Sequence, residues 1–440
     1  MDTERRGRRG SSTPGARAWL AAQWSAGGRV LQAHRTAVLA AGTTYVVLLT
    51  LSPILMTPYR GDDTINRNYP QILTATGEPL LGAAYTEFKA QVLAWMTNQG
   101  RFFPGSTAWG LSVFATFQTR LAYKLFLVAL CLLMVLLVAW LVTTLTRSRV
   151  AGIVTTIGLS ATLTLSMWAD GLDSFAGLLP LTICCAVAST LLLLRGRRRL
   201  SIVLAVTLWI VALLTYEVVI VMTPVLCLVI WLARRGPGRS LALLWPTLVD
   251  GVAVLYLRAH ATAEAPAYQI NLEPARVTVT YVKQTAAALP LSQWWYPGSG
   301  VPSPSHLVVA MAIVGVGIPV AIVLACVHRS RPDPSWRSLG MLALLGGTFW
   351  LAPPVLIAIT LRWQNELPPG QGYLSVVWGY VGVAVLLATG WLALAKRHAA
   401  HPGLGSRSAL VSATAVLSVL VALNVAQSLS IANQLAYPVA

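Results

Sequence analysis

Long apolar stretches recur from one end of the chain to the other, separated by short polar segments. Each is close to or above the roughly 20 residues that a helix needs to cross the hydrocarbon core of a membrane. The stretches cover about 36–56, 123–145, 150–168, 175–194, 201–233, 241–257, 307–327, 339–361, 374–395 and 410–431. With 56% hydrophobic and 10% charged residues and a mean hydropathy of +0.67, the chain is too apolar for a soluble fold. The pattern predicts an all-α, polytopic integral membrane protein.

Basic clusters decide how the stretch 201–233 is divided, since it is too long for one span and short for two. The clusters lie at the amino terminus, at 147–149, at 195–199, at 234–239, at 329–337 and at 396–407. If all face the cytoplasm, as the positive-inside bias requires, an even number of crossings separates Arg199 from Arg234. The stretch is therefore expected to be a hairpin with Thr215, Tyr216 and Glu217 at its outer tip. About eleven spans result in the cell's inner (plasma) membrane, with a cytoplasmic amino terminus and an extracytoplasmic carboxyl terminus.

This topology divides the chain into a tail and one transmembrane domain. Residues 1–35 form a basic cytoplasmic tail, expected to be disordered, and residues 36–440 form the transmembrane domain. Its two larger outer loops, 58–122 and 258–306, are expected to carry short interfacial segments: a helix at Thr86–Asn98 and a helix or strand at Arg276–Leu289. The net charge of +18 lies mostly in the cytoplasmic clusters, beside anionic lipid, so it does not indicate nucleic-acid binding.

Two adjacent acids, Asp62 and Asp63, stand in the first outer loop of a chain with only 14 acidic residues. Neighbouring side chains on regular structure point in different directions, so one acid is expected to face a reacting centre and the other backbone donors or a metal. Asp63 is the preferred general base. The alternative is an Asx turn that caps the next helix. The nearby Arg60 and Arg67 are expected to keep both acids ionised.

Other acids occur in apolar surroundings. Glu217 sits within the stretch 213–219, where a charge near hydrocarbon is functional by default unless it marks a hydrated turn or pairs with an arginine. Asp250 is expected to be a buried partner of a neighbouring polar group. Asp170 and Asp173 are expected to form a short outer turn without a catalytic role.

Cations are depleted on the outer side, so the few found there are candidate phosphate ligands. They are Arg101, Arg258, Lys283 and Arg362. Each has an alternative role as a membrane anchor whose charged end reaches the interface. Trp363 and Tyr373 lie near outer loops, where aromatic rings stack on sugars or form interfacial belts.

The Asp62-Asp63 pair after the first span, in a large helical body with polar residues gathered on one side, resembles the GT-C superfamily of membrane glycosyltransferases. The segments Gly100-Arg101-Phe102-Phe103-Pro104 and Leu214-Thr215-Tyr216-Glu217 are similar to features of its bacterial glucosyltransferase-like members. The resemblance covers only these short stretches and the topology. The chain departs from the family in having no soluble carboxy-terminal carbohydrate-binding domain.

The resemblance implies an inverting transfer of a sugar from a polyprenyl-phosphate donor to an envelope glycan, lipid or protein. Asp62 or Asp63 would be the base, Glu217 a further catalytic acid, and Tyr216 and Tyr373 would join the cations in binding substrate. Family members differ in metal dependence, so a divalent metal is compatible with the resemblance but not indicated, and no other cofactor is implied.

Two other functions fit the composition. A transporter or flippase for a lipid or amphiphile would place ionisable groups such as Asp250 near the bilayer middle and interrupt spans with prolines such as Pro224 and Pro246. A non-catalytic assembly subunit is the third alternative. The position of most polar candidates at the outer rim favours surface chemistry, and therefore the enzyme.

Overall fold

The computed structural model describes residues 35–437, apart from 76, 78, 169, 197, 235–237, 261–268, 296–299, 302 and 330–333. Within these residues the chain is helical, and β pairing is limited to one isolated bridge between Ile270 and Thr360. The predicted all-α class is confirmed. The amino-terminal tail assigned to residues 1–35 lies almost wholly outside the described residues.

Eight helical segments of the described chain are long and apolar enough to cross a membrane. They are α2 with η1 (Arg35–Leu51, Ser52–Leu55), α7 (Arg120–Thr146), η2 with α9 (Phe175–Gly177, Leu178–Arg195), α12 (Leu241–His260), α14 through η5 to α15 (His306–Ala312, Ile313–Gly317, Ile318–His328), α16 with α17 (Trp336–Leu351, Pro353–Ala358), α19 (Val376–Ala400) and α20 (Leu404–Ala436). Three shorter helices also coincide with predicted spans: α8 (Arg149–Thr162), α10 (Arg199–Thr215) and α11 (Val219–Arg234). The protein is therefore a helical membrane protein, and the predicted break in 201–233 is confirmed at residues 216–218. The count of eleven spans and their orientation stay predictions.

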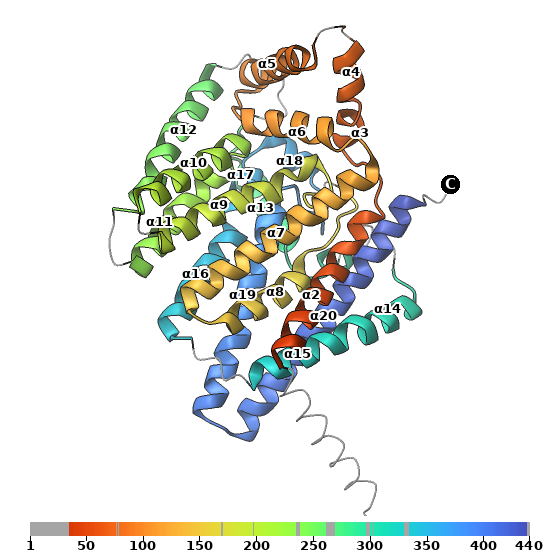
Figure 1. Ribbon diagram of the computed structural model, residues 1–440, viewed down its shortest axis with the longest axis vertical. Helices are drawn as coiled ribbons and strands as arrows, with labels where there is room; N and C mark the ends of the chain where they lie inside the picture. The colour runs from red at the N-terminus through yellow and green to blue at the C-terminus, as the bar shows by residue number, and fades with distance from the viewer. Residues whose placement is uncertain are drawn as a thin grey trace, which may run out of the picture.

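The centre of the bundle is formed by α8, α9 and α19, whose side chains are mostly buried (Figure 1). Small residues let these helices approach closely. A Cβ atom added at Gly158 of α8 would lie 2.6 Å from the carbonyl oxygen of Ala384 in α19, and one added at Gly382 would lie 2.5 Å from that of Gly346 in α16. Small residues at such crossings are typical of membrane helix packing, where apolar attraction between helices is weak.

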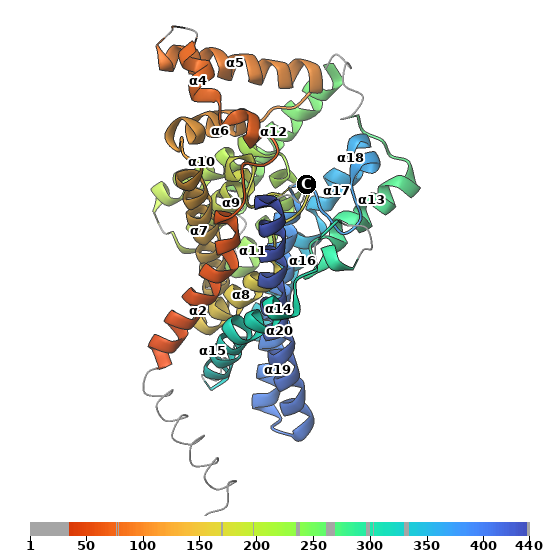
Figure 2. The same cartoon turned by 90° about the vertical axis from the view of Figure 1, so that its right-hand side faces the viewer.

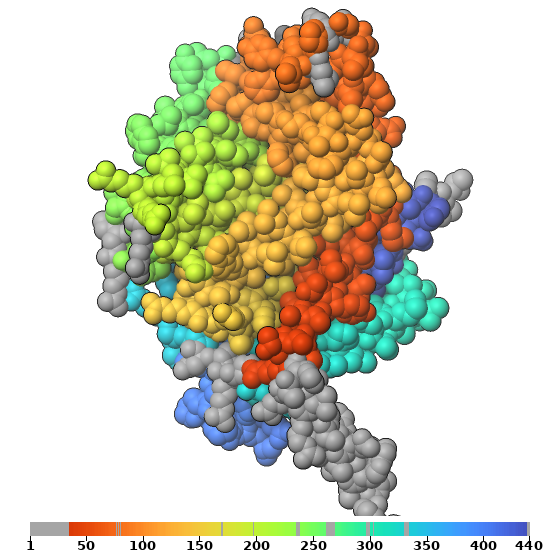
Figure 3. Space-filling view, in the orientation of Figure 1, coloured from red at the N-terminus to blue at the C-terminus, as the bar shows by residue number. Residues whose placement is uncertain are grey.

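The first loop builds a cap of short helices at one end of the molecule, which we call the loop end (Figures 1 and 2). The cap contains α3 (Asp63–Asn66), α4 (Tyr69–Ala75), α5 (Leu80–Gln99) and α6 (Pro104–Thr116). In the space-filling view its residues cover the top of the molecule, above α7 and α2 (Figure 3). The second loop contributes α13 (Pro274–Ala286) and η4 (Ser292–Trp294), and α18 (Leu361–Glu366) follows α17. The predicted helix Thr86–Asn98 falls inside α5, and the segment expected as helix or strand at Arg276–Leu289 is largely the helix α13.

One predicted span is wrong in its last third. The apolar stretch 150–168 is helical only to Thr162, and after the Leu163 N–H, which still donates to the Leu159 carbonyl, residues 164–168 continue without helical hydrogen bonding. Carbonyl oxygens of 163–168 accept hydrogen bonds from buried or partly buried side chains: Leu163 from Asn424, Leu165 from Gln293, and Met167 and Trp168 from Arg60. Irregular backbone is tolerated at this depth because it is enclosed in protein and its polar groups are paired. The segment thereby brings Trp168 and Asp170 to the loop end.

Candidate active site

A cavity of about 540 Å³ lies at the loop end. Its walls come from the cap, the 168–178 segment, the break between α10 and α11, α18 and the loop before α19. Its charged lining residues are Asp62, Arg101 and Arg362, and its aromatic ones are Tyr69, Trp95, Phe103, Trp168, Phe175, Tyr216, Trp363 and Tyr373. The volume is in the range of small-molecule sites, and the lining combines apolar faces with a few charges, as such sites do.

The two adjacent acids point in different directions. Asp62 precedes α3, is exposed and borders the cavity. Surrounding protein raises the pKa of its carboxyl, while Arg362 lowers it. A carboxylate whose pKa is raised in a cavity is better matched to proton abstraction than an ordinary surface aspartate.

Asp63 has no exposed surface and does not border the cavity. Its carboxylate accepts hydrogen bonds from the Tyr123 hydroxyl at 2.5 Å and from the Ala176 backbone N–H at 3.2 Å. Burial raises its pKa to about 7. The preference for Asp63 over Asp62 is therefore corrected: of the two acids, Asp62 borders the cavity, whereas Asp63 is fully buried and holds the backbone of Ala176.

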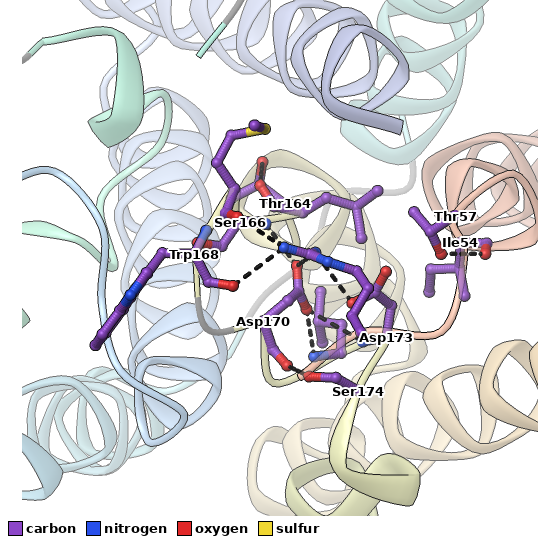
Figure 4. Close-up of polar contacts among 12 residues, drawn as sticks. Ile54, Thr57, Thr164, Ser166, Trp168, Asp170, Asp173 and Ser174 are labelled. Atoms are coloured by element: carbon purple, nitrogen blue, oxygen red, sulfur yellow. Dashed lines mark hydrogen bonds and ion pairs between the residues drawn. The ribbon is translucent and has the colours of Figure 1, made fainter. Parts of the chain in front are cut away.

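Arg60 does not serve the Asp62-Asp63 pair as expected. Its guanidinium lies 3.2 Å from Asp173 and 3.6 Å from Asp170, and it donates to the backbone of 167–168 (Figure 4). Lys124 completes this group, with its Nζ donating to the Asp173 carbonyl at 2.9 Å. We call these four residues the buried ion cluster, since each is at most 8% exposed. The sequence placed Asp170 and Asp173 in an outer turn and missed this burial.

A smaller chamber of about 50 Å³ adjoins the cavity, and Glu217 stands in it between two arginines. The Glu217 carboxylate lies 3.4 Å from Arg101 and 3.4 Å from Arg258. Glu217 therefore pairs with arginine, which is one of the alternatives set out for it. Among the residues that line the chamber, two guanidinium groups therefore face a single carboxylate, a balance that favours an anion over a cation.

Arg101 is positioned by the end of the cap. Gly100 ends α5 in the left-handed conformation at φ 58°, a turn that glycine adopts without a steric penalty. The Arg101 guanidinium then lies 4.5 Å from the centre of the Phe103 ring and 5.8 Å from that of Trp95. These cation–π contacts hold it where the cavity and the chamber adjoin.

The cavity and the chamber share four lining residues: Arg101, Tyr216, Trp363 and Tyr373. The structure therefore brings together, over these two spaces, Asp62, Glu217, Arg101, Arg258, Arg362, Tyr216 and Tyr373. Lys283 lies elsewhere: its Nζ donates to the Leu367 carbonyl at 3.2 Å, and it lines neither space. Asp250 also lies outside both spaces, and its Oδ2 has no hydrogen-bond partner among the described residues.

Several cavity residues were missed from the sequence. They are Asn66, Tyr69, Gln91, Trp95, Ser106, Trp168, Ser174 and Phe175. Trp95 had a sequence signal, as part of the apolar face of an interfacial helix, and it lines the cavity together with Gln91, which was assigned to another face of that helix. The others come from turns whose direction depends on the tertiary fold.

The described residues contain no group of three or more His, Cys, Asp or Glu side chains arranged to hold a metal ion. Asp62 faces Arg362, and Glu217 is paired with two arginines, so the acids at the site have cationic neighbours already. The residues present do not fit a divalent metal, and we derive no step through one.

Comparison of the chain with family models, with curated proteins and with solved structures finds no match.

Proposed function

We propose that the protein is an inverting glycosyltransferase that moves a sugar from a polyprenyl-phosphate donor to an acceptor hydroxyl at the extracytoplasmic face of the plasma membrane. One observation carries the proposal. A carboxylate on one wall of a cavity, Asp62, shares that cavity with Arg101, which also lines an adjoining chamber with Arg258. This arrangement provides a base and an anion site in one continuous space within a membrane-embedded body.

In the proposed reaction, the Asp62 carboxylate takes the proton of the acceptor hydroxyl. The acceptor oxygen attacks the anomeric carbon from the side opposite the phosphate, and the bond between that carbon and the phosphate oxygen breaks. The electron pair leaves with the lipid phosphate, whose charge Arg101 and Arg258 stabilise. Glu217 partly neutralises the two arginines and does not exchange a proton with the substrate.

The direct test is sugar transfer by the full-length protein reconstituted in vesicles, with a radiolabelled prenyl-phosphate sugar and an envelope fraction as acceptor. Asp62→Asn keeps the shape of the side chain but removes the base. We expect turnover to fall by roughly a hundredfold or more. Glu273→Gln is the control, because it removes a half-exposed carboxylate of the second loop that pairs with Arg276 and lines neither the cavity nor the chamber. Wild-type turnover in the Asp62→Asn protein would reject Asp62 as the base.

A second candidate function, movement of a lipid or amphiphile across the membrane, is favoured by Asp250. This acid lies on α12 at 8% exposure, and its Oδ2 has no partner among the described residues. Ionisable groups buried at membrane depth are typical of transport pathways. A transporter would move labelled lipid between leaflets without a covalent product, and Asp250→Asn would slow it more than Asp62→Asn.

A further inference from the structure

Three aromatic rings form a wall at the place where the cavity and the chamber adjoin. Trp363 and Tyr373 border both spaces, and Trp168 borders the cavity. The rings of Trp363 and Tyr373 are stacked, with centroids 3.7 Å apart and planes 26° apart. Trp168 meets Trp363 edge-on at 5.9 Å and lies 6.2 Å from Tyr373. We call these three residues the aromatic wall.

The aromatic wall is fixed from behind. The buried side-chain amide of Gln284 accepts from the Tyr373 N–H at 2.8 Å and donates to the Tyr373 carbonyl at 3.0 Å. Trp363 is 5% exposed, and the Arg362 guanidinium lies 4.8 Å from its ring centre. The rings come from the 163–174 segment, α18 and the loop before α19, so three parts of the fold meet there. A surface held this firmly binds a ligand with little ordering cost.

We infer that the aromatic wall is the platform for the sugar ring of the donor. This inference rests on the proposed function, because it takes the chamber as the site of the donor phosphate. The anomeric carbon is bonded directly to a phosphate oxygen. A phosphate held by Arg101 and Arg258 therefore places the sugar where the chamber opens into the cavity, beside Trp363 and Tyr373.

The chemistry of the remaining lining fits a sugar better than a prenyl chain. A sugar ring has apolar faces of C–H groups, which pack on aromatic rings, and hydroxyls around its edge. The cavity offers Asn66 and Ser106 as hydrogen-bonding groups in addition to its aromatic rings. A prenyl chain would displace water from these two side chains without replacing its hydrogen bonds, at a cost in binding free energy.

The test compares two ligands that differ only in the sugar. Glycosyl farnesyl phosphate and methyl farnesyl phosphate carry the same lipid and the same phosphodiester charge. Glucosyl, mannosyl and arabinosyl forms are tried, and the tightest is used. Their affinities are measured on the full-length protein in detergent by isothermal titration calorimetry. Tyr373 is the position to change, because it is only partly buried and its neighbours hold its backbone. Tyr373→Leu removes the ring, and Tyr373→Phe keeps it while removing the hydroxyl.

We expect Tyr373→Leu to weaken the glycosyl diester roughly tenfold while changing the methyl diester by less than about twofold. Tyr373→Phe should bind both as the wild type does. If Tyr373→Leu weakens both diesters equally, or if Tyr373→Phe weakens the glycosyl diester as much as Tyr373→Leu does, the sugar platform is overturned and the proposed function stands. If the wild type binds neither diester, the proposed function itself fails, and the platform with it.

Discussion

Two groups of charges lie at the same end of the molecule and differ in their exposure. The buried ion cluster of Arg60, Lys124, Asp170 and Asp173 is closed to solvent and hydrogen-bonded to the backbone around it. The second group, Asp62, Arg101, Arg258 and Arg362, faces the cavity or its chamber, and we call it the open charge set. Its arginines are more exposed, at 15% for the side chain of Arg101, 29% for Arg258 and 35% for Arg362.

This difference separates structure from binding. Charges removed from water must be paired, and the buried ion cluster meets that requirement with its own residues and backbone. The open charge set lines the cavity or its chamber, so a ligand can reach it. Asp62 and Asp63 show the same contrast between neighbours in sequence, because one borders the cavity and the other contacts Tyr123 and Ala176.

The largest effect should follow from breaking the buried ion cluster. Asp173→Ala removes the carboxylate 3.2 Å from Arg60 and leaves buried cations with less compensation. We expect a loss of about 3–5 kcal/mol in the free energy of unfolding, measured by thermal or chemical unfolding in detergent. Glu273→Gln is the matched control, since it breaks a shorter ion pair of 2.8 Å to Arg276 that is half exposed, for which about 0.5 kcal/mol or less is expected. Equal losses in the two variants would show that burial does not distinguish these pairs.

A smaller effect, on binding, is expected from the open charge set. Glu217→Gln removes the carboxylate that Arg101 and Arg258 share, and so increases the positive charge of the chamber. We expect the affinity for methyl farnesyl phosphate to rise, and Arg258→Gln to lower it roughly tenfold. Lys283→Gln is the control, because that cation caps the Leu367 carbonyl outside the chamber. If Glu217→Gln weakens anion binding, then Glu217 positions the arginines more than it competes with the ligand.

The sequence predicted the membrane-embedded helices because hydropathy reports directly on burial in lipid. It also located the break beside Glu217, because basic clusters on both flanks required a hairpin. It failed at residues 163–168, where an apolar composition is equally suited to irregular backbone enclosed in protein. Whether Asp62 or Asp63 meets the cavity depends on Tyr123 and Ala176, which lie far along the chain, and local sequence carries no signal for such a choice.

Residues that pair with the acids were harder to predict than the acids themselves. Arg60 stands two positions from Asp62, so proximity in sequence suggested that it would keep the acid pair ionised. The fold turns Arg60 toward Asp173, more than a hundred residues away along the chain. Glu217 likewise pairs with residues that are distant along the chain, Arg101 and Arg258. The sequence therefore identified which charged residues were candidates for the site, but not which of them pair with one another.

The smallest effect expected concerns Asp63 and pH. Burial raises its pKa to about 7, well above that of the same carboxyl in the unfolded chain, so the folded protein favours the protonated form. The stability that this group contributes is fully present at acidic pH and is lost as pH rises through about 7. In Asp63→Asn the position no longer titrates, while an amide still accepts from Tyr123. From about pH 6 to about pH 8, the free energy of unfolding of wild type should therefore fall by about 1 kcal/mol relative to Asp63→Asn. Unfolding in detergent across this range measures the difference, and a constant gap between the two proteins would mean that Asp63 does not titrate there. Such a result would place Asp63 among the charges that are compensated in the folded state, together with the buried ion cluster beside it.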